Sequence, residues 1–297
     1  MNENREIKKD VVVGATQNKP TQNNPAKKPF VKRFGQGGGG GGRKNFRNKK
    51  TGFSQPYADT TPELKPMEWK PEDNLKIIPL GGCEEVGRNM PVFEYGQDIV
   101  ILDMGLQFPE QDMPGIDYVI PNTEYLKGKE KNIKAVIFSH GHLDHIGAGP
   151  ILLKKLNYPP VIGRPLTLDM IKHRMEDSEK GSSQKLNASY IKSLDEKLDL
   201  GSFKVSWFAI DHAIMDAVGV ILETPVATVV HPGDWTIEKD PIGRDILHYH
   251  QLANLKRPSI LMLEALGAIN NKPPVTEQEM LDNINKIIGG APGRTII

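Results

Sequence analysis

The sequence predicts an α/β fold with mixed sheets, and the order of its apolar segments indicates this class. Short segments with strand-like character arrive in groups within residues 76–140 and 203–264. Two segments that are expected to be helical, 150–156 and 166–177, lie between the groups. Groups of strands separated by helices are typical of layered domains in which helices cover packed sheets.

The first group of strands begins where the polar N-terminal region ends, and its expected members are 76–80, 91–95, 98–103 and 135–140. Segments 91–95 and 98–103 flank Gly96 and alternate enough to form a hairpin. Segment 135–140 opens with the continuous apolar run AVIF, which predicts a buried strand.

The second group supplies a further set of strands, which we expect at 203–210, 218–222, 227–231 and 259–264. A helix should follow over 279–288, because Thr276 and Glu279 have the spacing of a capping box.

Residues 1–72 differ from the rest in composition, since they are rich in Asn, Lys, Gln, Pro and Gly and lack hydrophobic periodicity. We expect a disordered tail.

Residues 1–58 contain 13 Lys or Arg and 3 Asp or Glu, a formal charge of +10, against +1 for the whole chain. Cations attract phosphates and interleaved phenylalanines can stack on bases, so one hypothesis is an RNA-binding arm; the other is a solvated tail without a specific partner. The candidate RNA-binding side chains are Arg33, Arg43, Lys44, Arg47, Lys49 and Lys50.

Apolar run lengths and the cysteine content of the sequence indicate the cellular compartment of the protein. No apolar run approaches the length of a membrane span, and the N-terminus has no apolar stretch of signal-peptide length. A single cysteine, Cys83, fits a reducing compartment. We therefore predict a cytoplasmic protein with no membrane partner.

The segment SHGHLDHIGAG, residues 139–149, concentrates metal-ligand side chains directly after a predicted strand. His140 and His142 alternate, so an extended chain directs both to one side. Asp144 and His145 follow at an expected turn and can reach a second point. Imidazole and carboxylate groups are ligands of zinc and similar divalent ions. Ordinary structural histidines are the alternative, which this density of ligands disfavours.

This segment resembles the HxHxDH signature of the metallo-β-lactamase superfamily, which implies an αββα sandwich and two divalent metal ions. The order of motifs then adds His212, in FAIDHAIMDAVG, and Asp234, in VVHPGDW. The resemblance assigns one ion to His140, His142 and His212, and the other to Asp144 and His145, with Asp234 bridging both. Zn²⁺ is the first choice of metal, with Mn²⁺ and Mg²⁺ as alternatives.

Two further residues are expected to support the ligands. Asp103, in ILDMG, matches an early Asp of the superfamily and is assigned to orienting the ligating groups, with a turn carboxylate as the alternative. His231 lies three residues before Asp234 and either lines the site or has a structural role. Among the ligands, Asp144 and Asp234 are expected to take part in catalysis, by holding a metal-bound hydroxide.

The region 80–122 closely resembles the ribonuclease J family, part of the β-CASP branch of the superfamily. The matching motifs are LGG (80–82), Glu85, Gly87, Asn89, Asp103, Gly105, FPE (108–110) and GIDYVIP (115–121). The resemblance implies 5′→3′ exonuclease and endonuclease activity in RNA processing and decay, with metal-bound hydroxide attacking the phosphodiester. It also implies single-stranded RNA with a 5′-monophosphate as substrate, homo-oligomers of the full-length form, and partners from RNA degradation or the ribosome.

The resemblance also predicts the domain organisation. Residues 73–265 are expected to form an incomplete metallo-β-lactamase domain, whose C-terminal return segment is absent, and residues 266–297 the beginning of a β-CASP domain. We expect a truncated chain that lacks the general acid and has impaired activity. Two other hypotheses are a non-nucleolytic hydrolase of thioesters or lactones, and a non-catalytic RNA-binding fragment.

Overall fold

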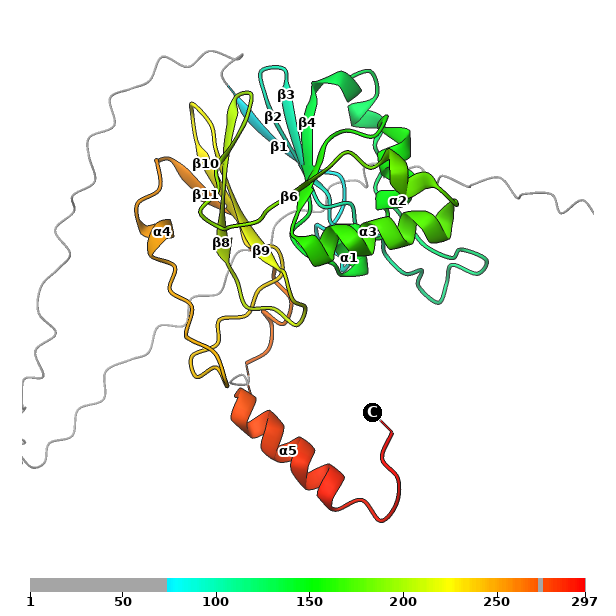
Figure 1. The fold of residues 1–297 in the computed structure, drawn as a ribbon, viewed down its shortest axis with the longest axis vertical. Coiled ribbons are helices and arrows are strands. Elements are labelled where there is room, and N and C mark those ends of the chain that lie inside the picture. Colours follow the sequence, from blue (N-terminus) through cyan, green and yellow to red (C-terminus); the bar gives the residue numbers. More distant parts are fainter. Residues whose placement is uncertain (1–73, 272–274, 297) are drawn as a thin grey trace, which may run out of the picture. The chain divides into compact units, whose positions relative to one another are not determined.

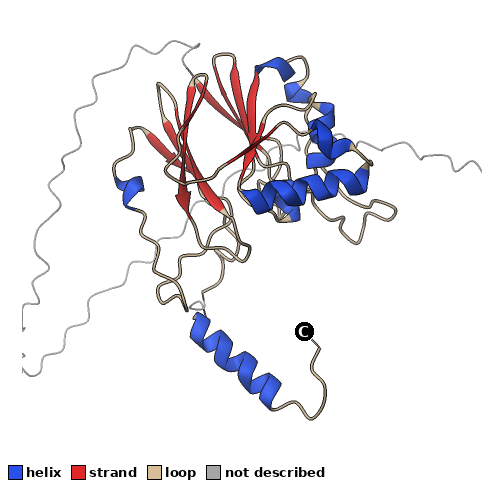
Figure 2. Cartoon of the chain, viewed as in Figure 1, coloured by secondary structure: helices blue, strands red, loops and turns tan. Residues whose placement is uncertain are grey.

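The computed structural model describes residues 74–271 and 275–296 of the chain. The predicted basic tail, with its six candidate RNA-binding side chains, lies outside the described residues. Within the described part, two β-sheets pack face to face, with helices on the outer side of the larger sheet (Figures 1 and 2).

The larger sheet has six strands in the order β1-β2-β3-β4-β5-β6. The first three strands pair antiparallel, and the remaining pairs are parallel. These strands are β1 Leu75–Pro79, β2 Pro91–Tyr95, β3 Asp98–Leu102, β4 Ile133–Ile137, β5 Val161–Gly163 and β6 Ala188–Tyr190.

The smaller sheet has five strands in the order β11-β10-β9-β8-β7. Its strands pair antiparallel except for β10 and β11, which run parallel. They are β7 Leu198–Leu200, β8 Phe203–Ala209, β9 Val218–Glu223, β10 Thr228–His231 and β11 Ser259–Leu261.

Helices α1, α2 and α3 lie on the outer face of the larger sheet, and α4 lies beside the smaller one (Figure 1). The α-helices are α1 Leu143–Ile146, α2 Gly149–Lys155, α3 Pro165–Ser178, α4 His250–Ala253 and α5 Glu277–Gly289, and the short 3₁₀ helices are η2 Glu124–Leu126, η3 Glu130–Asn132 and η4 Ser182–Lys185. Thr276 and Glu279 form the predicted capping box at the start of α5. None of the helices in the described ranges is both long and apolar enough to cross a bilayer.

The core explains why the larger sheet is buried on both faces. Along β3, Ile99 and Ile101 pack toward the helices, whereas Val100 and Leu102 pack toward the smaller sheet. Side chains at alternate positions of a strand point to opposite faces, so one apolar strand serves two cores. The inner core also includes Trp207 of β8. This arrangement confirms the predicted α/β sandwich.

The structure corrects the predicted end of the strand before the histidines. β4 ends at Ile137 rather than at residue 140. The reason is local: the Ser139 amide donates to the Asp103 carboxylate at 2.7 Å instead of pairing with a neighbouring strand. Asp144 and His145 lie in the one-turn helix α1 rather than in a turn. Of the predicted strand 259–264, only Ser259–Leu261 is β-structure.

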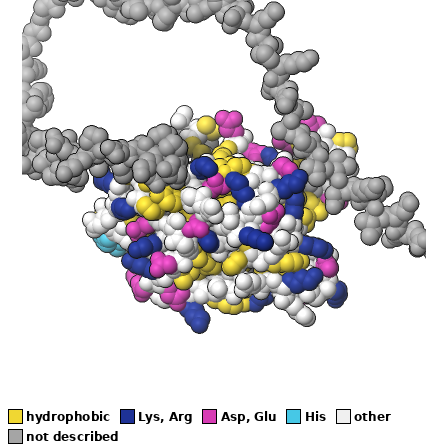
Figure 3. Space-filling view, turned by 90° about the horizontal axis from the view of Figure 1, so that it is seen from above, with side chains coloured by type: hydrophobic (Ala, Val, Ile, Leu, Met, Phe, Trp, Pro, Cys, Tyr) yellow, Lys and Arg dark blue, Asp and Glu magenta, His cyan; other side chains and the backbone are white. Residues whose placement is uncertain are grey.

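The surface of the described part carries both signs of charge. On the face shown in Figure 3, acidic and basic side chains are interspersed, and apolar side chains lie between them. This visible face therefore offers no continuous cationic surface among the described residues.

Candidate metal centre

The candidate ligands lie where strands of both sheets end. His140 and His142 follow β4 of the larger sheet, and His145 lies on α1 immediately after them. His212 follows β8 of the smaller sheet, and Asp234 follows β10. Residues far apart in the sequence therefore meet at one edge of the sandwich.

Three imidazoles form the first ligand group. Nε2 of His140 lies 3.1 Å from Nδ1 of His142, and Nε2 of His212 lies 3.0 Å from the same Nδ1. The three nitrogens are close enough to hold one metal ion. The structure thus brings His212 together with the His140 and His142 pair, and its role as a metal ligand stays a prediction.

The second group combines His140, His145 and Asp234, whose ligand atoms lie within 4.8 Å of one another. Nε2 of His145 lies 3.2 Å from Oδ1 of Asp234 and 3.5 Å from Oδ2 of Asp144. His140 is the residue that the two groups share. The carboxylate of Asp234 belongs to the group of His140 and His145 and not to the group of His142 and His212. That Asp234 bridges two metal ions therefore stays a prediction.

Asp103, which directly follows β3, supports the candidate ligands through its carboxylate. Its carboxylate accepts hydrogen bonds from the Ser139 amide at 2.7 Å and the Ser139 hydroxyl at 2.8 Å, and lies 2.8 Å from Nδ1 of His145. The Asp103 and His145 side chains are only 1 % and 2 % exposed. Asp103 fixes the orientation of His145, so that Nε2 faces Asp234.

Three carboxylates stabilise the charged form of His145, which in turn stabilises the ionised forms of Asp144 and Asp234. Burial alone would lower the pKa of His145, but Asp103, Asp144 and Asp234 raise it well above the ordinary value. Burial opposes ionisation of Asp234, yet His145 and the other imidazoles lower the pKa of this carboxyl to about 2. Burial also opposes ionisation of Asp144, but its contact with His145 lowers the pKa of this carboxyl.

Two other candidate ligands, His140 and His212, favour the neutral form that metal ligation requires. Burial, together with the charge on His145, lowers the pKa of His140 to about 3. Burial also lowers the pKa of His212. Three imidazole nitrogens that face one another, beside ionised carboxylates, are suited to a divalent cation. The donor set therefore fits the metal ions that the sequence motif implies.

His231 and Glu264 lie near the ligands without joining either group. Nδ1 of His231 accepts a hydrogen bond of 2.9 Å from the Gly233 amide, which orders the turn that carries Asp234. Burial lowers the pKa of His231 to about 4. Burial and the charge of Asp234 raise the pKa of Glu264.

Sequence patterns did not single out three residues that contact the candidate ligands or order a neighbouring loop. Ser139 links Asp103 to Nδ1 of His140, 3.0 Å from its hydroxyl. Asn89, which the sequence showed only as part of a motif, places Nδ2 3.2 Å from Nε2 of His145. Asp216 accepts from the Leu166 amide at the start of α3 and so tethers the loop that follows His212.

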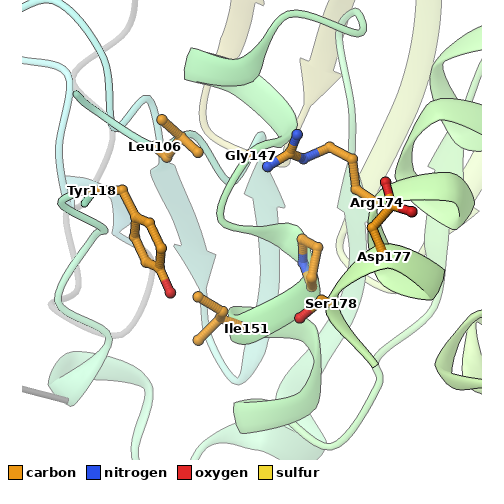
Figure 4. A pocket seen from close by; sticks show the side chains of 8 residues that line it. Leu106, Tyr118, Gly147, Ile151, Arg174, Asp177 and Ser178 are labelled. Atoms are coloured by element: carbon orange, nitrogen blue, oxygen red, sulfur yellow. The ribbon is translucent and has the colours of Figure 1, made fainter. Parts of the chain in front are cut away.

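A cavity of about 270 Å³ lies near the start of α2, apart from the candidate ligands. Figure 4 shows Arg174 and Asp177 of α3 on one side of it and Tyr118 on the other. Its walls also include Gly147, two residues after His145. The cavity is thus a neighbour of α1 rather than part of the metal centre.

A family comparison decides the fold family of this chain. The model of the metallo-beta-lactamase superfamily matches residues 87–268, which include every candidate ligand. The chain belongs to the metallo-beta-lactamase superfamily. This superfamily membership agrees with the sandwich and with the histidines and carboxylates at its edge.

Within the metallo-beta-lactamase superfamily, the chain is similar to curated proteins named ribonuclease J. The protein of Thermus thermophilus is 36 % identical over 236 residues, which are 76 % of this chain and 40 % of that protein. The protein of a Synechocystis species is 33 % identical over 226 residues, 75 % of this chain and 35 % of that protein. The chain therefore spans well under half the length of these relatives.

A solved structure also shares the metallo-beta-lactamase fold of this chain. A protein of unknown function from Enterococcus faecalis aligns with a TM-score of 0.50 and 16 % identity, over 75 % of this chain and 59 % of that one. This likeness concerns the fold alone.

Proposed function

We propose that this protein is a metal-dependent ribonuclease whose centre binds two divalent cations. The observation that carries the proposal is the pair of ligand groups that share His140, in a chain similar to ribonuclease J. The first ion would be held by His140, His142 and His212. The second would be held by His145, Asp234 and Asp144, with Asp234 as the bridging carboxylate. Asp144 lies outside both ligand groups, with Oδ2 3.5 Å from Nε2 of His145.

Cations in such a centre supply a nucleophile at neutral pH and neutralise the charge that develops on a phosphoryl group. The residues of the chain have separate roles around them. Asp103 holds His145 in the orientation that directs Nε2 to the centre. Ser139 holds Nδ1 of His140 and thereby directs its Nε2 toward His142.

The substrate we propose is single-stranded RNA with a 5′-monophosphate, cleaved as a 5′→3′ exonuclease and as an endonuclease. Zn²⁺ is the proposed metal, because imidazole predominates among the ligands. We also propose a metallo-β-lactamase domain over residues 73–265 and the beginning of a β-CASP domain over 266–297. Homo-oligomer formation and association with RNA-degradation or ribosomal partners stay predictions.

The test uses the 297-residue chain, a 5′-monophosphorylated single-stranded RNA, and zinc or manganese, with enough protein to detect the impaired activity expected of this chain. His142→Ala should abolish cleavage, because it removes the imidazole that contacts both other members of the first group. His173→Ala is the matched control, since this imidazole lies on α3 and is 79 % exposed. Cleavage that persists in His142→Ala, or hydrolysis of thioesters or lactones without cleavage of RNA, would contradict the proposal.

A further inference from the structure

The side chain of Asn89 lies against the second ligand group. Asn89 precedes β2, in the loop that begins after β1. Its Nδ2 lies 3.1 Å from the carbonyl oxygen of Asp144 and 3.2 Å from Nε2 of His145. The contact with a carbonyl oxygen, which can only accept, fixes which end of the amide faces the centre. An N–H donor therefore points at the ligand nitrogen of His145.

The position of Asn89 is fixed by its backbone as well as by its side chain. Its amide donates to the Asp144 carbonyl at 3.2 Å, and its carbonyl accepts from the Gly105 amide at 3.0 Å. The loop packs closely there, because a Cβ at Gly82 would lie 2.5 Å from Oδ1 of Asn89. The donor is thus held in place before any ligand binds, which is the condition for electrostatic preorganisation.

The ligand nitrogen of His145 offers this donor no acceptor. Nε2 has no free lone pair when it carries a proton, and none when it ligates an ion. One N–H of Asn89 keeps the Asp144 carbonyl, and the other is left without an acceptor beside a cationic centre. An oxyanion drawn to that centre is the natural acceptor.

We propose that Asn89 is a catalytic residue, which donates a hydrogen bond to a non-bridging oxygen of the RNA phosphate at the metal centre. This inference rests on the proposed function, since it needs a phosphate and two bound cations. The neighbouring cation, Arg88, is paired with Glu85 of the same loop. Asn89 therefore supplies a neutral, directional contact to the phosphate.

The experiment measures two quantities on the intact chain, zinc stoichiometry and the affinity of the zinc-loaded protein for inorganic phosphate. Asn89→Ala should retain both zinc ions and bind phosphate about 10- to 100-fold more weakly, as expected for the loss of a hydrogen bond to a charged group. Asn89→Asp, of the same size, should also weaken phosphate binding and covers the case in which the alanine variant does not fold. Asn122→Ala is the matched control, because Asn122 is an exposed asparagine that caps the Glu124 amide.

The outcomes separate this inference from the proposed function. Phosphate affinity that is unchanged in both Asn89 variants overturns the inference, and so does the loss of one zinc ion, which would place Asn89 in the support of the metal ligands. An unaltered protein that binds no zinc contradicts the proposed function itself. Weaker phosphate binding with full zinc content supports both.

Discussion

Asp103 shows how one residue can organise a site from outside it. Its backbone φ is 59°, in the left-handed region that non-glycine residues rarely adopt. This conformation places the carboxylate in contact with Ser139 and His145, which come 36 and 42 residues later in the sequence. Such strain persists where the surrounding contacts stabilise it, and here those contacts hold a candidate metal ligand.

Replacing Asp103 by Asn should weaken metal binding as well as folding. The amide removes the negative charge and leaves one buried donor facing other donors, so we expect stability to fall by about 1–3 kcal/mol. Because His145 loses its orienting carboxylate, zinc affinity should fall about 10- to 100-fold. Urea unfolding and competition with a chromophoric chelator measure the two effects.

Asp98 provides the control for Asp103, at the other end of β3. It accepts hydrogen bonds from the Ser202 amide and hydroxyl at 2.7 and 2.8 Å. Asp98→Asn should destabilise the fold without changing zinc affinity. Equal losses of zinc affinity in the two variants would show that Asp103 acts only through general stability.

Zinc binding should release a proton from His145 at pH 7. The raised pKa of this imidazole keeps it protonated at that pH, whereas ligation through Nε2 requires the neutral form. The affinity of the second ion should therefore rise with pH up to the pKa of His145 and then level off. His140, with a pKa of about 3, is already neutral and contributes no proton.

Calorimetry in buffers of different ionisation enthalpy measures this release. In His145→Gln the release should disappear. Zinc binding to the unaltered protein at pH 7 without any proton release would disprove the protonation state assigned to His145.

At the scale of elements, sequence patterns predicted the longer strands and the short strand β11, and missed three other short strands. Segments such as β8 and β9 have enough apolar residues to be recognised, and their observed bounds lie within a residue or so of those expected. Strands β5, β6 and β7 have three residues each, too few for an alternation pattern. Helix α1 has four residues and depends on backbone contacts with Met104 and Leu106.

The candidate site was predictable to the extent that its ligands follow one another along the chain. The candidate ligands His140, His142 and His145 can be recognised in the sequence, because they lie within six consecutive residues. Asn89 and Asp216 gave no comparable signal, since their roles depend on which loops the packed sheets bring together. Ser139 was adjacent to the motif, yet its contact with Asp103 follows from where β4 ends.

Three segments of the site pack against one another at Gly105: the loop after β3, helix α1 and the loop before β2. A Cβ there would lie 1.6 Å from the carbonyl oxygen of Asp144 and 2.7 Å from the Asn89 nitrogen. Gly105→Ala should therefore displace α1, cost about 1–3 kcal/mol or more of stability, and lower the affinity for the second zinc ion. Thermal unfolding and zinc titration check the two effects.

Gly289→Ala is the corresponding control in α5, where no atom lies within 4 Å of an added Cβ. Alanine favours the helical conformation over glycine, so this variant should be neutral or more stable. A Gly105→Ala protein with unchanged stability and zinc content would refute the close packing described for this loop.

At the scale of the whole chain, charge is unevenly divided between the N-terminal residues and the rest. Residues 1–58 carry a formal charge of +10, against +1 overall. If this arm binds RNA through phosphates, its deletion should weaken RNA binding and flatten the dependence of affinity on salt. Binding of a single-stranded RNA at several salt concentrations tests this, and an unchanged salt slope would leave the arm without a role in RNA binding.

The meeting of two sheets at the metal centre has a consequence for folding cooperativity. His142 follows a strand of one sheet and His212 a strand of the other, 70 residues later. A cation held between them would act as a reversible cross-link, which closes this loop in the native state and not in the unfolded chain. Zinc at about 100 times its Kd should then add about 2.7 kcal/mol to the free energy of unfolding, and a chelator should remove it. Separation of the sheets would require release of the ion, so unfolding and demetallation should occur as one event, observable as coincident transitions in circular dichroism and zinc release.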